Sequence, residues 1–133
     1  MLQNLSFHHI GYAVKNIDAT AQFYLNAGWV KSETLLDSIQ NTYIAFLHRE
    51  GFPMIELVAP VDDQSPVSNI LKKSGVGTYH VCYSVPDIVQ AVNELRAQRY
   101  MPLFQPVEAV AMDNHRICYM MHPQVGLIEL VEE

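Results

Sequence analysis

The chain has 133 residues, which is enough for one domain with a substantial core. Half of the residues are hydrophobic and only 17% are charged, so the composition excludes a disordered chain. Eight basic against fourteen acidic residues give a net charge of -6, which argues against nucleic acid or an anionic membrane as a partner. Because no apolar run approaches the roughly 18 residues of a membrane span and the first residues lack the layout of a signal peptide, we expect a cytoplasmic protein.

The first predicted element is a strand in "HHIGYAV" (8–14). Side chains alternate across a strand, so Ile10, Tyr12 and Val14 share one face while His9 shares the other with small residues. The bulky face suits packing against a helix. The other face carries one polar group with open space beside it, as the wall of a binding site does.

A helix follows in "NIDATAQFYLNAGW" (16–29), because its apolar residues recur at intervals of three and four. Asn16 or Asp18 is the predicted N-cap, and Gly28 lies just past the predicted C-terminus. Strands are then predicted at 42–48 and 53–58. The second of these contains "IELV" (55–58), whose Glu56 is unusual because glutamate is disfavoured in strands and costly to bury.

The segment "SPVSNILKKSGVGT" (65–78) predicts a turn, a short helix and a glycine-containing entry to the second half. In that second half the sequence of the first predicted strand is repeated. "HVCYSVPDI" (80–88) lies over "HIGYAVKNI" (9–17) at an offset of 88 − 17 = 71, and Asp87 is the predicted N-cap of a second helix. Strands at 116–121 and 126–131 complete the half. Cys82 and Cys118 fall within strands and are predicted to be buried thiols, not a disulfide.

Both halves end on the same tetrapeptide, because "IELV" recurs at 128–131 with an offset of 128 − 55 = 73. A period of about 70 residues is too long for a solenoid repeat. The pattern instead predicts an α+β fold built from two paired βαβββ modules within one domain. Module one spans about 5–62, a linker spans about 63–77, and module two spans about 78–133.

Each module contributes one histidine and one glutamate at matching places. Glu56 follows His9 by 56 − 9 = 47 residues, and Glu129 follows His80 by 129 − 80 = 49 residues. A lone histidine of this kind is more often a hydrogen-bonded core residue, and a lone glutamate can sit at a sheet rim. The repetition of the pair favours a site where all four residues ligate one divalent metal ion, and such donors suit zinc, nickel, cobalt, manganese or iron.

Several segments carry a family resemblance that covers essentially the whole chain: "HHIGYAVKNID", "MIELVAPVDDQSPVSNILKKSG", "YHVCYSVPDI" and "MMHPQVGLIELVE". The chain resembles the vicinal oxygen chelate (glyoxalase/bleomycin resistance/dioxygenase) superfamily, and within it the methylmalonyl-CoA epimerase and glyoxalase I branch. The resemblance implies a half-open barrel around one divalent ion (Zn, Ni, Co or Mn), ligated by His9, Glu56, His80 and Glu129. It further implies that Glu129 is also the catalytic base, that the substrate is a small molecule, and that the protein is a homodimer.

Two positions depart from the epimerase pattern. Ile39 aligns with a second acid–base glutamate on the strand that leads into "AFL", and Asp37, two residues away, is not supported by the alignment. The second departure is that the corresponding epimerase stretch is altered here to "DNHRIC" (113–118), where Arg116 takes the position of the family's basic residue. Arg116 either binds a substrate carboxylate or phosphate, or is a solvated strand residue, and the sequence leaves both open.

The sequence therefore predicts a metal-dependent isomerase or lyase that stabilises an enolate of a small carbonyl or thioester compound during proton transfer. The alternative is a non-catalytic protein that sequesters a drug or metabolite in the same fold. A ring-cleaving oxygenase is disfavoured, because its iron normally has two histidines and one carboxylate, which leaves Glu56 as an extra ligand. Substrate, metal and the choice between a site within one chain and one between two chains stay open.

Overall fold

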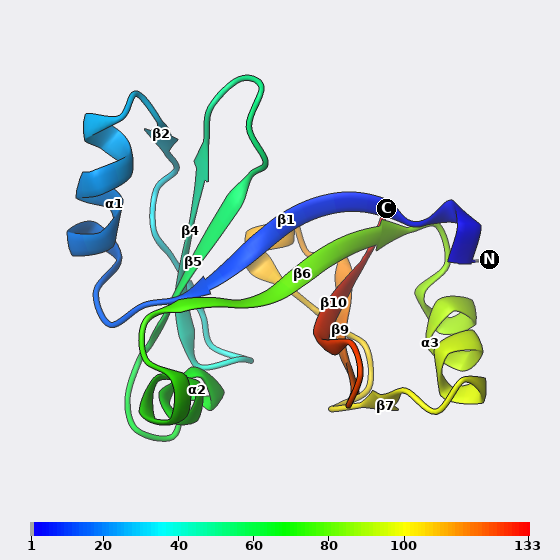
Figure 1. Cartoon of the computed structure of the whole chain (residues 1–133). Helices are drawn as coiled ribbons and strands as arrows, with labels where there is room; N and C mark the ends of the chain where they lie inside the picture. Colours follow the sequence, from blue (N-terminus) through cyan, green and yellow to red (C-terminus); the bar gives the residue numbers. More distant parts are fainter. Residues whose placement is uncertain (1) are drawn as a thin grey trace. The chain divides into compact units, whose positions relative to one another are not determined.

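The computed structural model describes residues 2–133, which divide into two compact units. The N-terminal unit comprises residues 9–79, and the C-terminal unit comprises residues 80–133 together with residues 2–8. Three α-helices and ten β-strands are present in the described part of the chain (Figure 1). The predicted α+β class is thereby confirmed.

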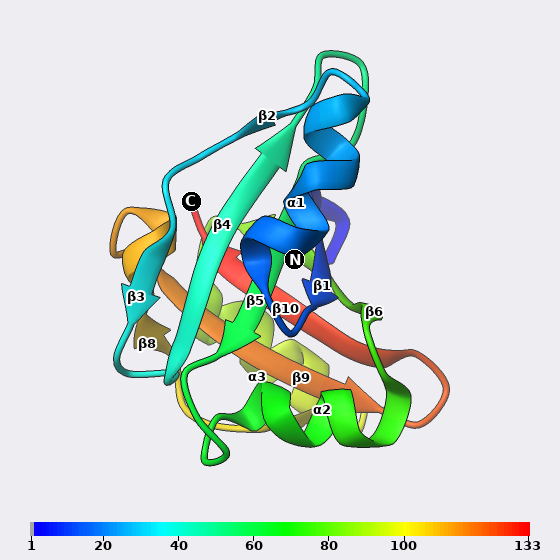
Figure 2. The same ribbon diagram turned by 90° about the vertical axis from the view of Figure 1, so that its left-hand side faces the viewer.

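In the N-terminal unit the strands follow the order β2-β4-β5-β1, and β3 pairs with β4. Strands β1 and β5 run parallel, whereas β4 and β5 are antiparallel. Helix α1 packs against β4 and β5 (Figure 2), and α2 contacts β5. The elements are β1 (Ser6–Ala13), α1 (Ile17–Asn26), β2 (Val30–Lys31), β3 (Leu35–Asp37), β4 (Thr42–His48), β5 (Ile55–Pro60) and α2 (Pro66–Ser74).

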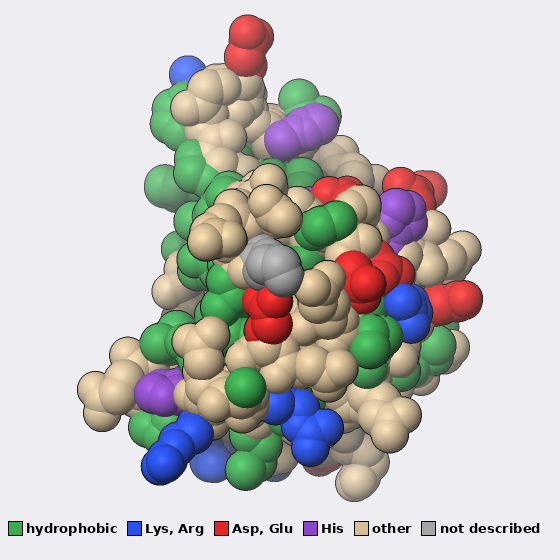
Figure 3. Space-filling view, turned by 90° about the vertical axis from the view of Figure 1, so that its right-hand side faces the viewer, with side chains coloured by type: hydrophobic (Ala, Val, Ile, Leu, Met, Phe, Trp, Pro, Cys, Tyr) green, Lys and Arg blue, Asp and Glu red, His purple; other side chains and the backbone are tan. Residues whose placement is uncertain are grey.

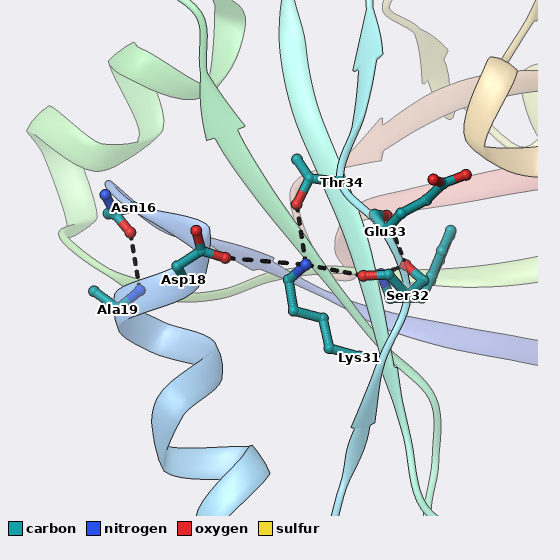
Figure 4. A network of polar contacts seen from close by, with 8 residues as sticks. Asn16, Asp18, Ala19, Lys31, Ser32, Glu33 and Thr34 are labelled. Carbon is teal, nitrogen blue, oxygen red and sulfur yellow. Dashed lines mark hydrogen bonds and ion pairs between the residues drawn. The ribbon is translucent and has the colours of Figure 1, made fainter.

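Local interactions determine where α1 begins and how it is held. Asn16 is its N-cap, and the Asn16 side chain accepts a hydrogen bond of 2.9 Å from the backbone N–H of Ala19. Figure 4 shows the ammonium group of Lys31, which donates to Thr34 Oγ1 at 3.1 Å and lies 4.0 Å from Asp18 Oδ1. These contacts join the first turn of α1 to β2 and the segment after it.

In the C-terminal unit the strand order is β6-β10-β9-β7, and β8 pairs with β9. Strand β10 is parallel to β6 and antiparallel to β9. Asp87 caps α3 as predicted, because its side chain accepts a 3.0 Å hydrogen bond from the Gln90 N–H. The elements are β6 (Gly77–Val85), α3 (Ile88–Ala97), β7 (Met101–Pro102), β8 (Val107–Glu108), β9 (Arg116–His122) and β10 (Gly126–Glu132).

Each unit has its own hydrophobic core between its helix and its sheet. Ala45, Leu47 and Leu57 pack beneath α1 in the N-terminal unit. The residues at the same places in the C-terminal unit pack beneath α3: Cys118, Met120 and Leu130. Cys82 and Cys118 are both buried and are not joined in a disulfide, as predicted.

The surface and the helices bear on possible partners. No helix within residues 2–133 combines the length and the apolar character needed to cross a membrane. On the face shown in Figure 3, most basic side chains gather along the lower edge and acidic side chains are spread above them. That face therefore carries no broad basic surface.

Candidate metal centre

The N-terminal unit brings together His9 and Glu56. They lie on the neighbouring parallel strands β1 and β5, where Gly11 is the residue directly opposite Glu56. His9 Nε2 lies 3.3 Å from Glu56 Oε1, and the two residues are 0% and 2% exposed. Phe46, which is directly opposite Glu56 on β4, places its ring edge-to-face with the imidazole at 5.6 Å. A histidine, a carboxylate and an aromatic ring thus form one buried cluster.

The C-terminal unit repeats this cluster with His80 and Glu129. His80 lies on β6 and Glu129 on β10, and the distance from His80 Nε2 to Glu129 Oε1 is 3.1 Å. Both side chains are almost completely buried. Tyr119, directly opposite Glu129 on β9, contacts the His80 ring edge-to-face at 5.2 Å. The duplication seen in the sequence therefore extends to the geometry of the side chains.

Each pair has the chemistry and spacing of two metal ligands. Donor atoms that bind one cation at about 2.1 Å and at right angles lie about 3 Å apart. A hydrogen bond between histidine and a carboxylate gives a similar separation. Burial is consistent with either arrangement, because a buried carboxylate is costly unless it is paired or coordinates a cation. One imidazole nitrogen and one carboxylate oxygen suit zinc, nickel, cobalt or manganese.

Comparison with known proteins identifies the family. The model of the Glyoxalase/Bleomycin resistance protein/Dioxygenase superfamily matches residues 8–119. This chain belongs to that superfamily. The resemblance to this superfamily that was inferred from the sequence is confirmed. Relatives and solved structures within the superfamily include methylmalonyl-CoA epimerases.

The mitochondrial methylmalonyl-CoA epimerase of Dictyostelium discoideum is 29% identical over 131 residues, which span 95% of this chain and 77% of the relative. The crystal structure of methylmalonyl-CoA epimerase from Mycobacterium tuberculosis has a TM-score of 0.83 and 29% identity, covering 95% of this chain and 86% of that one. A Streptomyces coelicolor methylmalonyl-CoA epimerase variant in complex with 2-nitronate-propionyl-CoA has a TM-score of 0.81 and 26% identity, with 96% of both chains covered.

In this superfamily member, the four predicted ligands occur as two pairs: His9 with Glu56 in one unit, and His80 with Glu129 in the other. Their common binding of one cation stays a prediction, as does the role of Glu129 as the base. The structure describes the two pairs themselves and the burial of all four side chains.

Arg116 has a protein partner that the sequence analysis missed. Its Nε and Nη2 atoms donate to the two carboxylate oxygens of Glu132 at 3.1 and 3.0 Å, and Glu132 Oε2 also accepts from the Ile88 N–H at 3.0 Å. The hydrogen bond and charge of Arg116 lower the pKa of Glu132. Arg116 shares its side of β9 with Cys118, which packs beneath α3, whereas Tyr119 lies on the other side. A substrate role for Arg116 stays a prediction.

The region of Ile39 differs from the sequence interpretation. Ile39 was aligned to a strand position, but it lies in the turn between β3 and β4 and is 65% exposed. The buried Asp37 carboxylate shapes this turn, because its Oδ1 accepts from the backbone N–H groups of Ile39 and Gln40, each at 3.0 Å. Its Oδ2 accepts from Gln40 Nε2 at 2.7 Å. This side chain therefore has a local structural role.

The aromatic residues beside the two pairs were also missed. Placing "YIAFL" (43–47) over "RICYM" (116–120) at the offset of 73 aligns Phe46 with Tyr119. This offset is the one that aligns the two "IELV" segments, so the signal was present in the sequence. It has meaning only once the register places Phe46 opposite Glu56 and Tyr119 opposite Glu129.

Proposed function

We propose that this chain is a divalent-metal-dependent isomerase of the methylmalonyl-CoA epimerase type. Its reaction is proton removal and return at the carbon between the carboxylate and the thioester of a small acyl-CoA. The observation that carries the proposal is the buried histidine–glutamate pair, present once in each unit at 3.3 and 3.1 Å. The epimerase relatives, which align over 95% of the chain, support the reaction type.

We infer that His9, Glu56, His80 and Glu129 together hold one cation, which is zinc, nickel, cobalt or manganese. The equal donor sets of the two units support this assignment, because one nitrogen and one carboxylate oxygen from each give four ligands in all. When bound, the cation supplies Lewis-acid stabilisation of negative charge on substrate oxygens. The two imidazoles serve as neutral donors.

Glu129 is the residue that moves the proton. Its carboxylate takes a proton from the substrate carbon, which leaves an enolate, and a water molecule on the opposite face delivers the proton that inverts the centre while Glu129 passes its own proton to solvent. Burial of Glu129 supports this role, because electrostatic interactions are stronger where water is excluded. The position at which the family resemblance places a second acid–base glutamate is occupied here by the exposed Ile39, which has no carboxylate.

Deuterium exchange tests this function. Protein reconstituted with each candidate cation is incubated with methylmalonyl-CoA in D2O, and deuterium at the carbon between the two carbonyl groups is followed by NMR. We expect metal-dependent exchange, and no turnover of the hemithioacetal of methylglyoxal and glutathione. Turnover of the hemithioacetal alone would assign a glyoxalase-type lyase instead. Ligand binding without either reaction would indicate the non-catalytic alternative.

A further inference from the structure

Next to Glu129, the sheet of the C-terminal unit carries a row of three apolar side chains. Met121 on β9 lies directly opposite Leu127 on β10 and directly opposite Met101 on β7. Residues opposite each other on paired strands share a face, as do residues two apart on one strand. The row therefore lies on the same face of the sheet as Glu129, and α3 packs on the other face. Met101, Met121 and Leu127 are called the methionine row below.

The methionine row is open to solvent, and the fold does not require it to be apolar. Met101 is 68% exposed, Met121 is 39% exposed, and Leu127 is half-buried. The residue of the N-terminal unit that matches Met121, at the offset of 121 − 48 = 73, is the exposed His48. The same architecture thus forms with a polar residue at this place, so packing of the core does not account for the exposed methionines.

The direction of the row suits a chain-like ligand that begins at Glu129. Leu127 is two residues from Glu129 along β10, which corresponds to about 6.8 Å. Neighbouring strands are about 4.8 Å apart, so the row extends about 10 Å across β10, β9 and β7. Strand β7 is the last in the strand order of this unit. A flexible apolar arm on this row would lead from the Glu129 carboxylate to the edge of the sheet.

The size of the row and the nearby charges favour the arm of a substrate over a second copy of the chain. A stable dimer buries about 800 Å² on each partner, which three partly exposed side chains do not supply. Arg99 is exposed and precedes Met101 by two residues, and the exposed Arg96 lies in the last turn of α3. Two cations beside the end of the row at β7 suit an arm that ends in phosphate groups.

We propose that the methionine row binds the pantetheine arm of an acyl-CoA substrate, with Met101 and Met121 as specificity-determining residues. The inference rests on the function proposed above and names the part of the substrate that this surface recognises. Methionine side chains are flexible and adapt to an irregular apolar partner, as the methylene segments of pantetheine are. Glutathione carries charges along its arm, and desolvating them on this row is costly. The row therefore favours a CoA thioester over a glutathione hemithioacetal.

Substrates with and without the arm test this role. Deuterium exchange is measured with methylmalonyl-CoA and with the S-methyl thioester of methylmalonate, in the wild type and in the double variant Met101→Gln/Met121→Gln. Glutamine keeps the length of methionine and adds polarity. We expect kcat/KM for the CoA thioester to fall about ten- to hundredfold, the range for burial of a methionine side chain, and by at least tenfold more than for the S-methyl thioester. Val89→Thr is the matched control, because Val89 is 48% exposed on α3, across the sheet from the row, and should keep the wild-type ratio.

Methionine NMR locates the arm without turnover. Protein labelled with ¹³C at the methionine methyl groups is titrated with propionyl-CoA and, separately, with the S-methyl thioester of propionate. The single glutamine variants assign the signals of Met101 and Met121. We expect both signals to shift with propionyl-CoA only, whereas the signal of the buried Met120, which packs beneath α3, should stay in place.

The outcomes separate this role from the proposed function. Equal losses with both thioesters, or no loss with either, would reject the row as the site of the arm and leave the epimerase function standing. Light scattering that shows a dimer in the wild type and a monomer in the double variant would assign the row to an interface between copies and reject the proposal. If the wild type exchanges neither thioester, the proposed function fails. Shifted Met101 and Met121 signals would then still support binding of the arm, and unshifted signals would reject it as well.

Discussion

His80→Ala provides the sharpest test of the metal site. A cation that binds only the folded protein stabilises it by about 4.1 kcal/mol at 1,000 times Kd. With 133 residues, the entropy of unfolding is about 280 cal/mol/K, so each kcal/mol raises Tm by about 3.6 °C. Saturating cation should therefore raise the Tm of the wild-type protein by about 15 °C.

The substitution also weakens the metal-free protein. It removes a buried ring and leaves the buried Glu129 carboxylate without its partner at 3.1 Å. Breaking such a buried pair costs about 3–5 kcal/mol. The free energy of unfolding of a typical domain is about 5–15 kcal/mol, so the variant protein should still fold. We expect His80→Ala to fold at low temperature with a reduced Tm in chelator and with no metal-dependent increase.

Differential scanning calorimetry, in chelator and then with each cation, measures both effects. His8→Ala is the matched control, because His8 precedes a proposed ligand but is partly exposed and lies 3.6 Å from Glu133. It should keep the full metal-dependent increase. Where His80→Ala does not fold, His80→Gln retains more of the side-chain volume. An increase in Tm as large as that of the wild type in either folded His80 variant would refute the four-ligand site.

Three further predictions follow from individual side chains. Glu56→Gln and Glu129→Gln should both weaken metal binding, but at saturating cation only Glu129→Gln should lose about 10²- to 10⁴-fold in deuterium exchange; equal losses would contradict a base role for Glu129. Arg116 holds the pKa of Glu132 below its usual range, so the stabilisation by Glu132 is complete above the unfolded pKa of about 4.3 and is lost as pH falls through the lower folded pKa. Glu132→Gln should thus be less stable than the wild type at pH 7 in urea unfolding, with the difference shrinking as the pH falls below the unfolded pKa; a constant difference would reject the ion pair. Burial raises the pKa of the Cys118 thiol to about 11, so it should react with a disulfide reagent at pH 8 only after unfolding, and rapid labelling of the native protein would contradict this burial.

The regular elements could be predicted because their patterns are strong. Strand β4 has the predicted bounds, 42–48, and β9 and β10 each extend one residue beyond their predicted ends. Strand β5 begins at Ile55 instead of at 53. The strands β2, β3, β7 and β8 were not predicted, because each has only two or three residues and depends on pairing with β4 or β9. Their formation depends on long-range partners, which sequence periodicity does not report.

The site was predictable to the extent that it is duplicated. A single histidine or glutamate in a strand has several explanations, whereas the repeated pair led to His9, Glu56, His80 and Glu129. The partner of Arg116 could not be found in this way, since the matching residue of module one at the same offset is Tyr43. An interaction that occurs in only one of the two modules cannot be predicted from the repeat. Its prediction requires the strand register and the position of the α3 N-terminus.

Strand alternation explains how the two modules can diverge in chemistry while they keep one architecture. Leu47 and Leu57 in one core correspond to Met120 and Leu130 in the other, so the helix-facing sides conserve apolar volume. On the opposite side the histidine and glutamate are retained, and the change from phenylalanine to Tyr119 alters polarity without altering the ring that packs on the imidazole. A substitution there can change the polarity of that side of the sheet with little effect on the core.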